Sequence, residues 1–178
     1  LDITIEPTLT IRSIYGLYFP HLVYLDENWA IENLALIFQH ETNKLIFWQA
    51  AWETYVEFCP VYNDVYNILD VYNILRAEYD FAVSQLTSDS QSVHDYQNRL
   101  AEHLITAYLK GKEPINEGDS LIKKFFEIAH EETRAHAITF VGRDMGYLLH
   151  TKTSEDLSAR FKRLWGYRLS AVKAQVNE

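Results

Sequence analysis

The chain has 178 residues, of which 48% are hydrophobic and 14% aromatic, whereas only six are glycine and four are proline. This composition excludes a disordered chain, and the few turn-forming residues favour long helices over many short strands. The single cysteine, Cys59, excludes an internal disulfide framework and a cysteine-based zinc site, and the net charge of −9 argues against a general nucleic-acid-binding protein.

The same features indicate the cellular compartment of the protein. A lone cysteine is typical of a reducing compartment, and no apolar run reaches the roughly 18 residues of a membrane-spanning helix. We therefore expect a cytoplasmic protein. Because the chain begins with Leu1 rather than methionine, we also expect it to be cut from a longer one.

Residues 1–25 are predicted to form an N-terminal segment with one short helix, which begins at Thr8 and stops before Pro20. Its expected buried stripe is Ile11, Ile14, Leu17 and Tyr18. Asp26 is expected to cap the next helix, with Glu27 in the first turn. The apolar stripe of that helix is Ile31, Leu34, Ala35 and Phe38.

The helix predicted over 43–59 has polar residues at every fourth position and is otherwise mostly apolar, which is typical of a helix covered on most sides. Trp48, Trp52 and Tyr55 lie on one stripe of this helix, at i, i+4 and i+7. Two interpretations stay open: the three aromatic side chains are part of the core, or they form an exposed ridge that anchors a binding partner.

Residues 61–86 contain the pentapeptide VYNIL twice, and apolar residues at alternating steps of four and three predict one continuous helix. Its expected core-facing residues are Val65, Ile68, Tyr72, Leu75 and Tyr79. A shift of six residues turns a helix by about 600°, so the two copies face different directions and Val71 is expected off the buried face. A local duplication explains the repeat better than a two-copy binding motif.

Four further helices are expected after residue 86. The first follows a polar loop and ends at Lys110-Gly111, which is a usual C-terminal signal. A short helix opened by Asp119 or Ser120 and a helix ending near Leu148 come next. The last helix follows a predicted capping box at Thr153 and Asp156. Its expected apolar stripe is Leu157, Phe161, Leu164, Trp165, Leu169 and Val172.

These elements predict an all-α fold of about eight helices, arranged as a compact helical-repeat-like array rather than a four-helix bundle. We divide the chain into the N-terminal segment, 1–25, and a single helical domain, 26–178.

The motifs that suggest a metal or catalytic site do not have the residue spacing that such sites need. HEETRAH, residues 130–136, places its histidines six apart instead of four, so no zinc site is predicted. Glu127 and His130 form a Glu-x-x-His pair, but a di-iron site needs a second pair that we do not find. Cys59 follows an apolar helix, which predicts a buried, inert thiol. We predict no catalytic, cofactor-binding or metal-binding residues.

Several stretches carry a family resemblance: LAEHLITAYLKG, ETRAHAITFVGR and LWGYRL near the C-terminus, and FPHLVYLDENWAIENLALIF and AAWETYV upstream. They resemble a C-terminal helical domain of unknown function in large bacterial antiviral defence proteins of the STAND-type NTPase or sirtuin-like kind. The resemblance covers roughly residues 14–175 and rests on helix-packing patterns. Gly166 departs from it, since an acidic residue is more usual there, and VYNILDVYNIL is longer than expected.

The resemblance implies a defence-protein module whose nucleotide chemistry lies elsewhere in a longer chain. We therefore expect a non-catalytic recognition or scaffolding module that binds a protein partner or packs on the NTPase core, with no nucleic-acid or membrane partner. The alternative is a small standalone helical enzyme with an unrecognised site.

The last helix suggests a docking face. Residues 1–119 carry 6 basic and 18 acidic groups, whereas residues 120–178 carry 10 and 7. Arg160, Arg163 and Lys173 are expected to lie away from the apolar stripe and to meet an acidic surface. The other interpretation is that they pair with acidic neighbours in their own fold.

Overall fold

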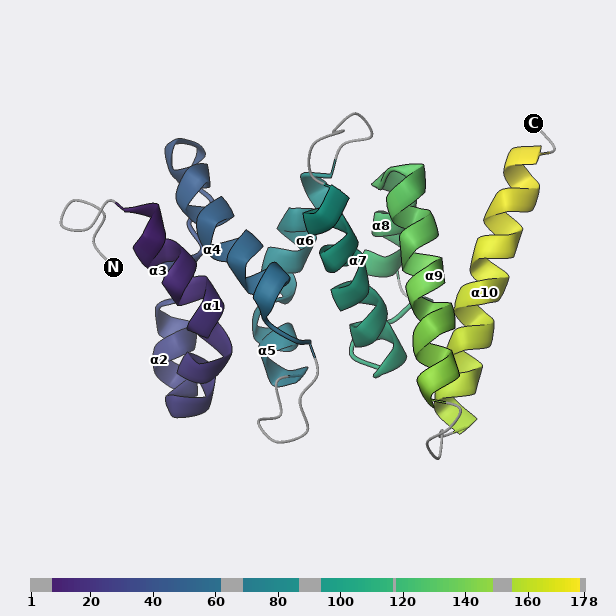
Figure 1. Ribbon diagram of the computed structural model, residues 1–178, viewed down its shortest axis with the longest axis horizontal. Helices are drawn as coiled ribbons and strands as arrows, with labels where there is room; N and C mark the ends of the chain where they lie inside the picture. The colour runs from purple at the N-terminus through teal and green to yellow at the C-terminus, as the bar shows by residue number, and fades with distance from the viewer. Residues whose placement is uncertain (1–7, 62–68, 87–93, 117, 149–154, 177–178) are drawn as a thin grey trace. The chain divides into compact units, whose positions relative to one another are not determined.

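The computed structural model describes residues 8–61, 69–86, 94–116, 118–148 and 155–176 (Figure 1). Within these ranges the regular elements are ten α-helices and one 3₁₀-helix, which confirms the predicted all-α class. The count exceeds the prediction because two of the expected helices are each divided in two.

The chain forms two compact units, Leu1–Phe81 and Ala82–Glu178. The predicted boundary after residue 25 does not match this division, because the helix before that boundary packs against a later helix of the first unit. Within each unit, helices pack against near neighbours in the sequence. That pattern is compatible with a helical repeat, which stays a prediction.

The first unit is built around two helices that pack together, α1 (Leu9–Leu25) and α4 (Leu45–Phe58). At Gly16 they approach so closely that an added Cβ would come within 1.9 Å of the carbonyl oxygen of Ala51. This close approach selects the face of α1 that is buried. The buried residues of α1 are Arg12, Gly16, Phe19 and Pro20.

Two predictions for α1 are therefore wrong. Ile14 and Tyr18, from the expected buried stripe, are 45% and 50% exposed, because the buried face is the one that carries Gly16. The helix also runs through Pro20 instead of stopping before it. Pro20 cannot donate a hydrogen bond to the Gly16 carbonyl oxygen. The thiol of Cys59 lies 3.9 Å from that oxygen and only 3.2 Å from the carbonyl oxygen of Leu17, which is its closer acceptor.

Two short helices follow, α2 (Glu27–Glu32) and α3 (Leu34–Ile37), and then the 3₁₀-helix η1 (Thr42–Lys44). The predicted cap is confirmed, because the Asp26 side chain accepts a hydrogen bond from the Trp29 amide at 3.0 Å. The predicted single helix is divided at Asn33. As a result Phe38 is buried as expected, whereas Ile31 is exposed.

The segment with the repeated pentapeptide forms α5 (Leu69–Ile74) and α6 (Arg76–Ser84), with a turn at Leu75 between them. Backbone hydrogen bonds from Leu75 to Val71 and from Tyr79 to Leu75 continue the helical pattern across this turn.

The expected burial of Tyr72, Leu75 and Tyr79 is confirmed, but the prediction that Val71 lies off the buried face is wrong. Since Val71 and Tyr72 are both buried, the segment is covered on more than one side. Val65 and Ile68 lie outside the described residues.

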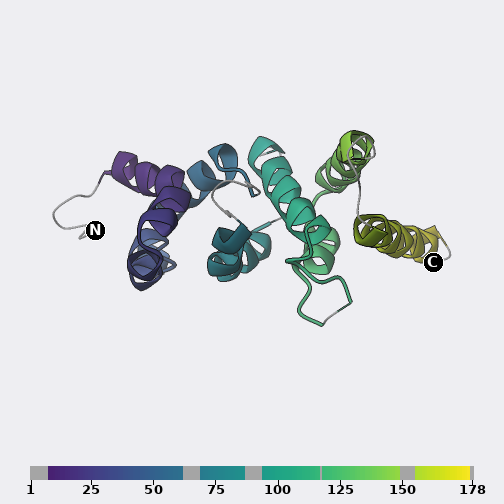
Figure 2. The ribbon, with the colours of Figure 1, turned by 90° about the horizontal axis from the view of Figure 1, so that it is seen from below.

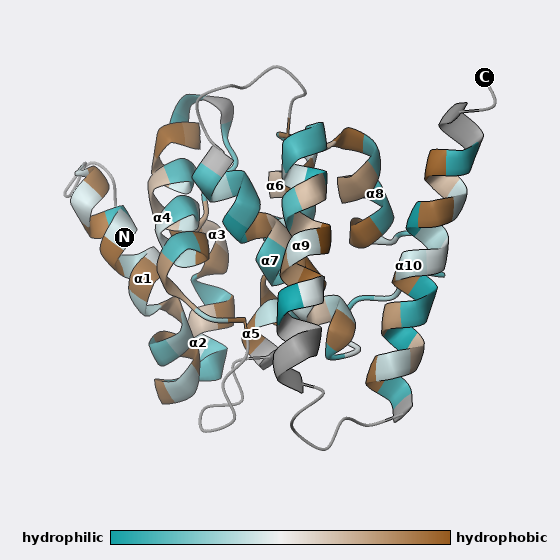
Figure 3. Ribbon diagram, turned by 45° about the vertical axis from the view of Figure 1, so that its right-hand side comes forward, coloured by the Kyte–Doolittle hydropathy of each residue, from teal (hydrophilic) through white to brown (hydrophobic). Residues whose placement is uncertain are grey.

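The second unit is arranged around α7 (His94–Leu109), which packs against α8 (Leu121–Ile128), α9 (Glu131–Leu148) and α10 (Glu155–Val176). Figures 1 and 2 both show α9 and α10 as neighbours at the C-terminal end of this unit. α8 is largely apolar (Figure 3). Its buried residues are Leu121, Ile122, Phe125 and Phe126.

The expected helix ends around the long loop of this unit are confirmed. Gly111 has a φ of +81°, and the amides of Gly111 and Lys112 bond to the carbonyl oxygens of Tyr108 and Ala107, each at 2.9 Å. This pattern is a Schellman motif. Ser120 caps α8, because its side-chain oxygen accepts a hydrogen bond from the Lys123 amide at 3.4 Å. Thr153, from the predicted capping box, lies outside the described residues.

Candidate functional site

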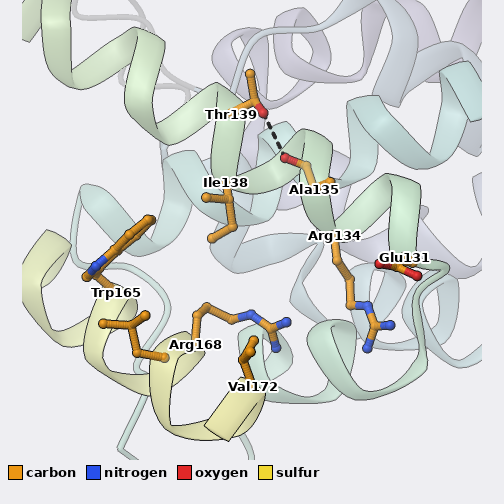
Figure 4. Close-up of a pocket in the computed structure, with 9 residues that line it drawn as sticks. Glu131, Arg134, Ala135, Ile138, Thr139, Trp165, Arg168 and Val172 are labelled. Atoms are coloured by element: carbon orange, nitrogen blue, oxygen red, sulfur yellow. Dashed lines mark hydrogen bonds between the residues drawn. The ribbon is translucent and has the colours of Figure 1, made fainter. Parts of the chain in front are cut away.

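A groove of about 730 Å³ lies between α9 and α10 in the second unit (Figure 4). From α9 it is lined by Glu131, Arg134, Ala135, Ile138 and Thr139. A volume of this size lies in the range of sites that hold a ligand or an anchoring segment of a partner.

The α10 wall of the groove is an apolar stripe made by Trp165, Leu169 and Val172. These residues are spaced at i, i+4 and i+7, so their side chains lie on one face of the helix. They were expected in the core, but they are 46%, 45% and 47% exposed. Leu164 is buried instead, so α10 uses a neighbouring face for its own packing and leaves this one on the groove.

Two arginines, Arg134 of α9 and Arg168 of α10, add positive charge to the groove (Figure 4). The Arg168 guanidinium carbon lies 4.4 Å from the ring centroid of Phe126, so a cation–π contact holds its side chain in place. Arg134 donates a hydrogen bond from Nη1 to the carbonyl oxygen of Phe126 at 3.2 Å. Both side chains are thus anchored on the same residue of α8.

The two guanidinium groups repel each other. Burial, and then the charge of Arg134, lower the pKa of Arg168 below its ordinary value. Among the described residues neither arginine is in an ion pair with a carboxylate. Two half-buried cations that line one groove attract an anion, because a bound anion offsets their repulsion.

The other polar groups of the groove are few. Glu131 is the one carboxyl group among its lining residues, and the Thr139 hydroxyl donates to the carbonyl oxygen of Ala135 at 2.9 Å. The lining contains no cysteine, histidine or serine. An apolar wall beside two cations suits binding better than covalent catalysis.

Arg160, a predicted docking residue, makes its contacts within the second unit. Its Nη2 lies 2.9 Å from the carboxylate of Asp156, and its backbone oxygen accepts a hydrogen bond from the Tyr108 hydroxyl at 2.7 Å. The guanidinium also packs where a Cβ on Gly111 would come within 2.7 Å of it. Arg160 thus has an acidic neighbour on its own helix, which is compatible with the pairing interpretation, and its role on a docking face stays a prediction.

Arg163 and Lys173, the other two predicted docking residues, are exposed on α10 but do not line the groove. Their role on a docking face stays a prediction.

Trp48, Trp52 and Tyr55 belong to the core of the first unit, with exposures of 6%, 0% and 0%. Trp52 packs edge-on against Tyr79, at a centroid distance of 4.9 Å, and the Tyr55 and Tyr79 hydroxyls lie 3.2 Å apart. The core interpretation is confirmed. The exposed ridge is wrong, because aromatic residues from several helices cover this stripe.

The residues of the rejected motifs have structural partners. His136 lies 2.9 Å from the carboxylate of Glu102, while the His130 ring accepts a hydrogen bond from the Glu132 amide at 3.4 Å. Burial raises the pKa of the Cys59 thiol to about 12, as expected for an inert thiol. Within the described residues no cluster of metal-ligating side chains occurs, and none of the helices there is long and apolar enough to cross a membrane.

The sequence analysis does not predict the groove, because its two arginines lie in stretches with other prominent features. Arg134 lies inside HEETRAH, whose histidines suggest a metal motif, and Arg168 lies in a helix that contains four other basic residues. A signal was present, since Trp165, Arg168 and Val172 share one face at i, i+3 and i+7. A cation within an apolar stripe indicates a face that is not fully buried.

The described residues thus form an all-α protein with a groove between two helices of its second unit. Comparisons with protein-family models, with curated proteins and with solved structures find no match to this chain.

Proposed function

We propose that this chain is a non-catalytic helical recognition module that binds a protein segment in the groove between α9 and α10. The observation that carries the proposal is the half-exposed stripe of Trp165, Leu169 and Val172, which faces Ala135 and Ile138 across the groove. Trp is common among the residues that dominate protein interfaces, and exposed apolar stripes of this kind are costly unless a partner covers them.

The biological setting is part of the same proposal. The resemblance to C-terminal helical domains of bacterial STAND-type and sirtuin-like defence proteins supports a cytoplasmic module of a longer antiviral protein. The bound segment belongs either to a separate partner or to the NTPase core of that longer chain. The module needs no cofactor of its own, and neither nucleic acid nor membrane is its partner.

The experiment compares two charge insertions on α10. Leu169→Glu places a carboxylate in the apolar groove, whereas Ser170→Glu places the same charge at an exposed position that does not line it. Both positions are exposed, so we expect both variants to keep the melting temperature of the unmodified chain. In the full-length protein, we expect Leu169→Glu to abolish protection of bacteria against phage and Ser170→Glu to preserve it.

Full protection by the Leu169→Glu protein would show that the groove has no role in recognition. Turnover of a nucleotide or nucleic acid by residues 1–178 alone would contradict the non-catalytic part of the proposal and favour the enzyme alternative.

A further inference from the structure

We infer that the segment bound in the groove is an acidic amphipathic helix of a partner protein, whose carboxylate bridges Arg134 and Arg168. The inference rests on the proposed recognition function and names the chemistry of the partner. It combines three features of the groove: its charge, its length and its lack of backbone hydrogen-bonding groups.

The charge of the groove selects an acidic segment. Arg134 and Arg168 both line it, both are anchored on Phe126, and neither is in an ion pair within the described chain. A carboxylate between them would accept charge-assisted hydrogen bonds from two preorganised guanidinium groups. A lysine in the same place would add a third positive charge, so basic segments are disfavoured.

The dimensions of the groove match a short stretch of helix. Its lining residues span 131–139 on α9 and 165–172 on α10. At about 1.5 Å per residue, these spans are roughly 10–12 Å long, which equals about two helical turns. Apolar anchors at i, i+4 and i+7 of a partner helix would meet the stripe of Trp165, Leu169 and Val172 over this length.

The walls of the groove favour a helix over an extended peptide. Both walls are helices, whose backbone groups beyond the first turn bond internally, so the groove offers mainly side chains and no free strand edge. An extended peptide would place its own amide and carbonyl groups against apolar side chains without partners, which is unfavourable. A helix satisfies these groups itself and presents only side chains.

The test uses fluorescein-labelled helical peptides of about 16 residues, a length at which helices become stable in water. The acidic peptides carry leucines at i, i+4 and i+7 with glutamates flanking the stripe. Matched peptides have glutamine in place of every glutamate. Binding to the 1–178 chain is measured by fluorescence anisotropy at low and high salt.

We expect the acidic peptides to bind about tenfold more tightly than the glutamine peptides, a difference of about 1.4 kcal/mol, because charge-assisted hydrogen bonds are stronger than neutral ones. Arg134→Gln and Arg168→Gln should each remove most of this difference, whereas Arg143→Gln, at an exposed arginine of α9 outside the groove, should preserve it. The melting temperature of each variant shows whether it folds. If Arg168→Gln does not fold, Arg168→Lys tests the same position with the positive charge retained.

Equal binding of acidic and glutamine peptides would overturn the inference and leave the recognition function intact. Failure of every peptide to bind would also overturn it, while the phage assay with Leu169→Glu still decides the recognition function separately. Binding of vesicles containing phosphatidylglycerol in preference to the acidic peptides would overturn it in favour of an anionic lipid.

Discussion

Glu78 joins two aromatic side chains in the first unit. One of its carboxylate oxygens accepts a hydrogen bond from the Trp48 indole at 2.9 Å and lies 2.6 Å from Nε2 of His40. The His40 ring stacks on Phe81 at a centroid distance of 4.2 Å. Burial raises the pKa of Glu78, and the hydrogen bonds from Trp48 and His40 offset only part of that rise.

This arrangement predicts a pH-dependent stability that Glu78→Gln removes. Folded Glu78 holds its proton more tightly than the unfolded chain does. Its contribution to the free energy of unfolding is therefore fully present below the ordinary glutamate pKa of 4.5 and falls as pH rises through the raised pKa. The glutamine variant keeps an acceptor for Trp48 but does not titrate. The stability of the unmodified chain relative to the variant should fall by up to about 1.4 kcal/mol per pH unit in that window.

Urea unfolding followed by tryptophan fluorescence at a series of pH values measures this difference. Glu32→Gln, at an exposed glutamate of the same unit, serves as the control and should leave the pH dependence unchanged. Parallel curves for the unmodified chain and Glu78→Gln would mean that the buried carboxyl does not control the stability.

At the scale of the elements, the crossing of α1 and α4 depends on one glycine. A Cβ on Gly16 would come within 1.9 Å of a backbone oxygen of α4, so no side-chain rotation could relieve the clash. Gly166 of α10 is a natural comparison, because a Cβ there meets nothing within 4 Å.

We expect Gly16→Ala to lower the free energy of unfolding by about 3 kcal/mol or more, because the helices must separate to accommodate the methyl group. Gly166→Ala should raise it by about 0.5–1 kcal/mol, because alanine favours the helix more than glycine does. Chemical denaturation of both variants gives the two values. A small effect of Gly16→Ala would show that α1 can shift on α4 at little cost.

Helical periodicity predicted some buried faces well and others poorly, for a physical reason. On α8 the apolar residues Ile122, Phe125 and Phe126, which share one face by spacing, are buried, because a short helix with one apolar face has one way to pack. On α1 apolar residues occur on more than one face, and the contact at Gly16, which involves backbone atoms distant in sequence, decides between them. Spacing contains no information on that contact.

The candidate site shows the same limit. The stripe of Trp165, Leu169 and Val172 is visible in the sequence, but whether another helix covers it depends on how α9 and α10 pack. The predicted docking cation Arg160 likewise looks exposed by spacing. Its backbone carbonyl oxygen accepts a hydrogen bond from the Tyr108 hydroxyl, because α10 packs against the end of α7. Tertiary contacts, not local pattern, separate binding residues from structural ones.

At the scale of the whole molecule, the charges are unevenly distributed, with the excess of basic residues in 120–178. The three predicted docking cations of α10 are of two kinds. Arg160 pairs with Asp156 and packs on the Schellman turn that ends α7. Arg163 and Lys173 are exposed. An exposed cation near a binding groove acts mainly by accelerating the encounter with an acidic partner, and salt screens this effect.

The last prediction separates these roles by charge reversal. Arg160→Glu should lower the free energy of unfolding by about 1 kcal/mol, because it replaces an i, i+4 ion pair with a repulsive pair and disturbs the contact at Gly111. Arg163→Glu combined with Lys173→Glu should slow the association of the acidic peptides at low salt, and the melting temperature of this variant checks that the fold is retained. Stopped-flow fluorescence at low and high salt measures that rate. If the double variant associates as fast as the unmodified chain at low salt, the basic surface of α10 has no steering role, and binding depends on the groove alone.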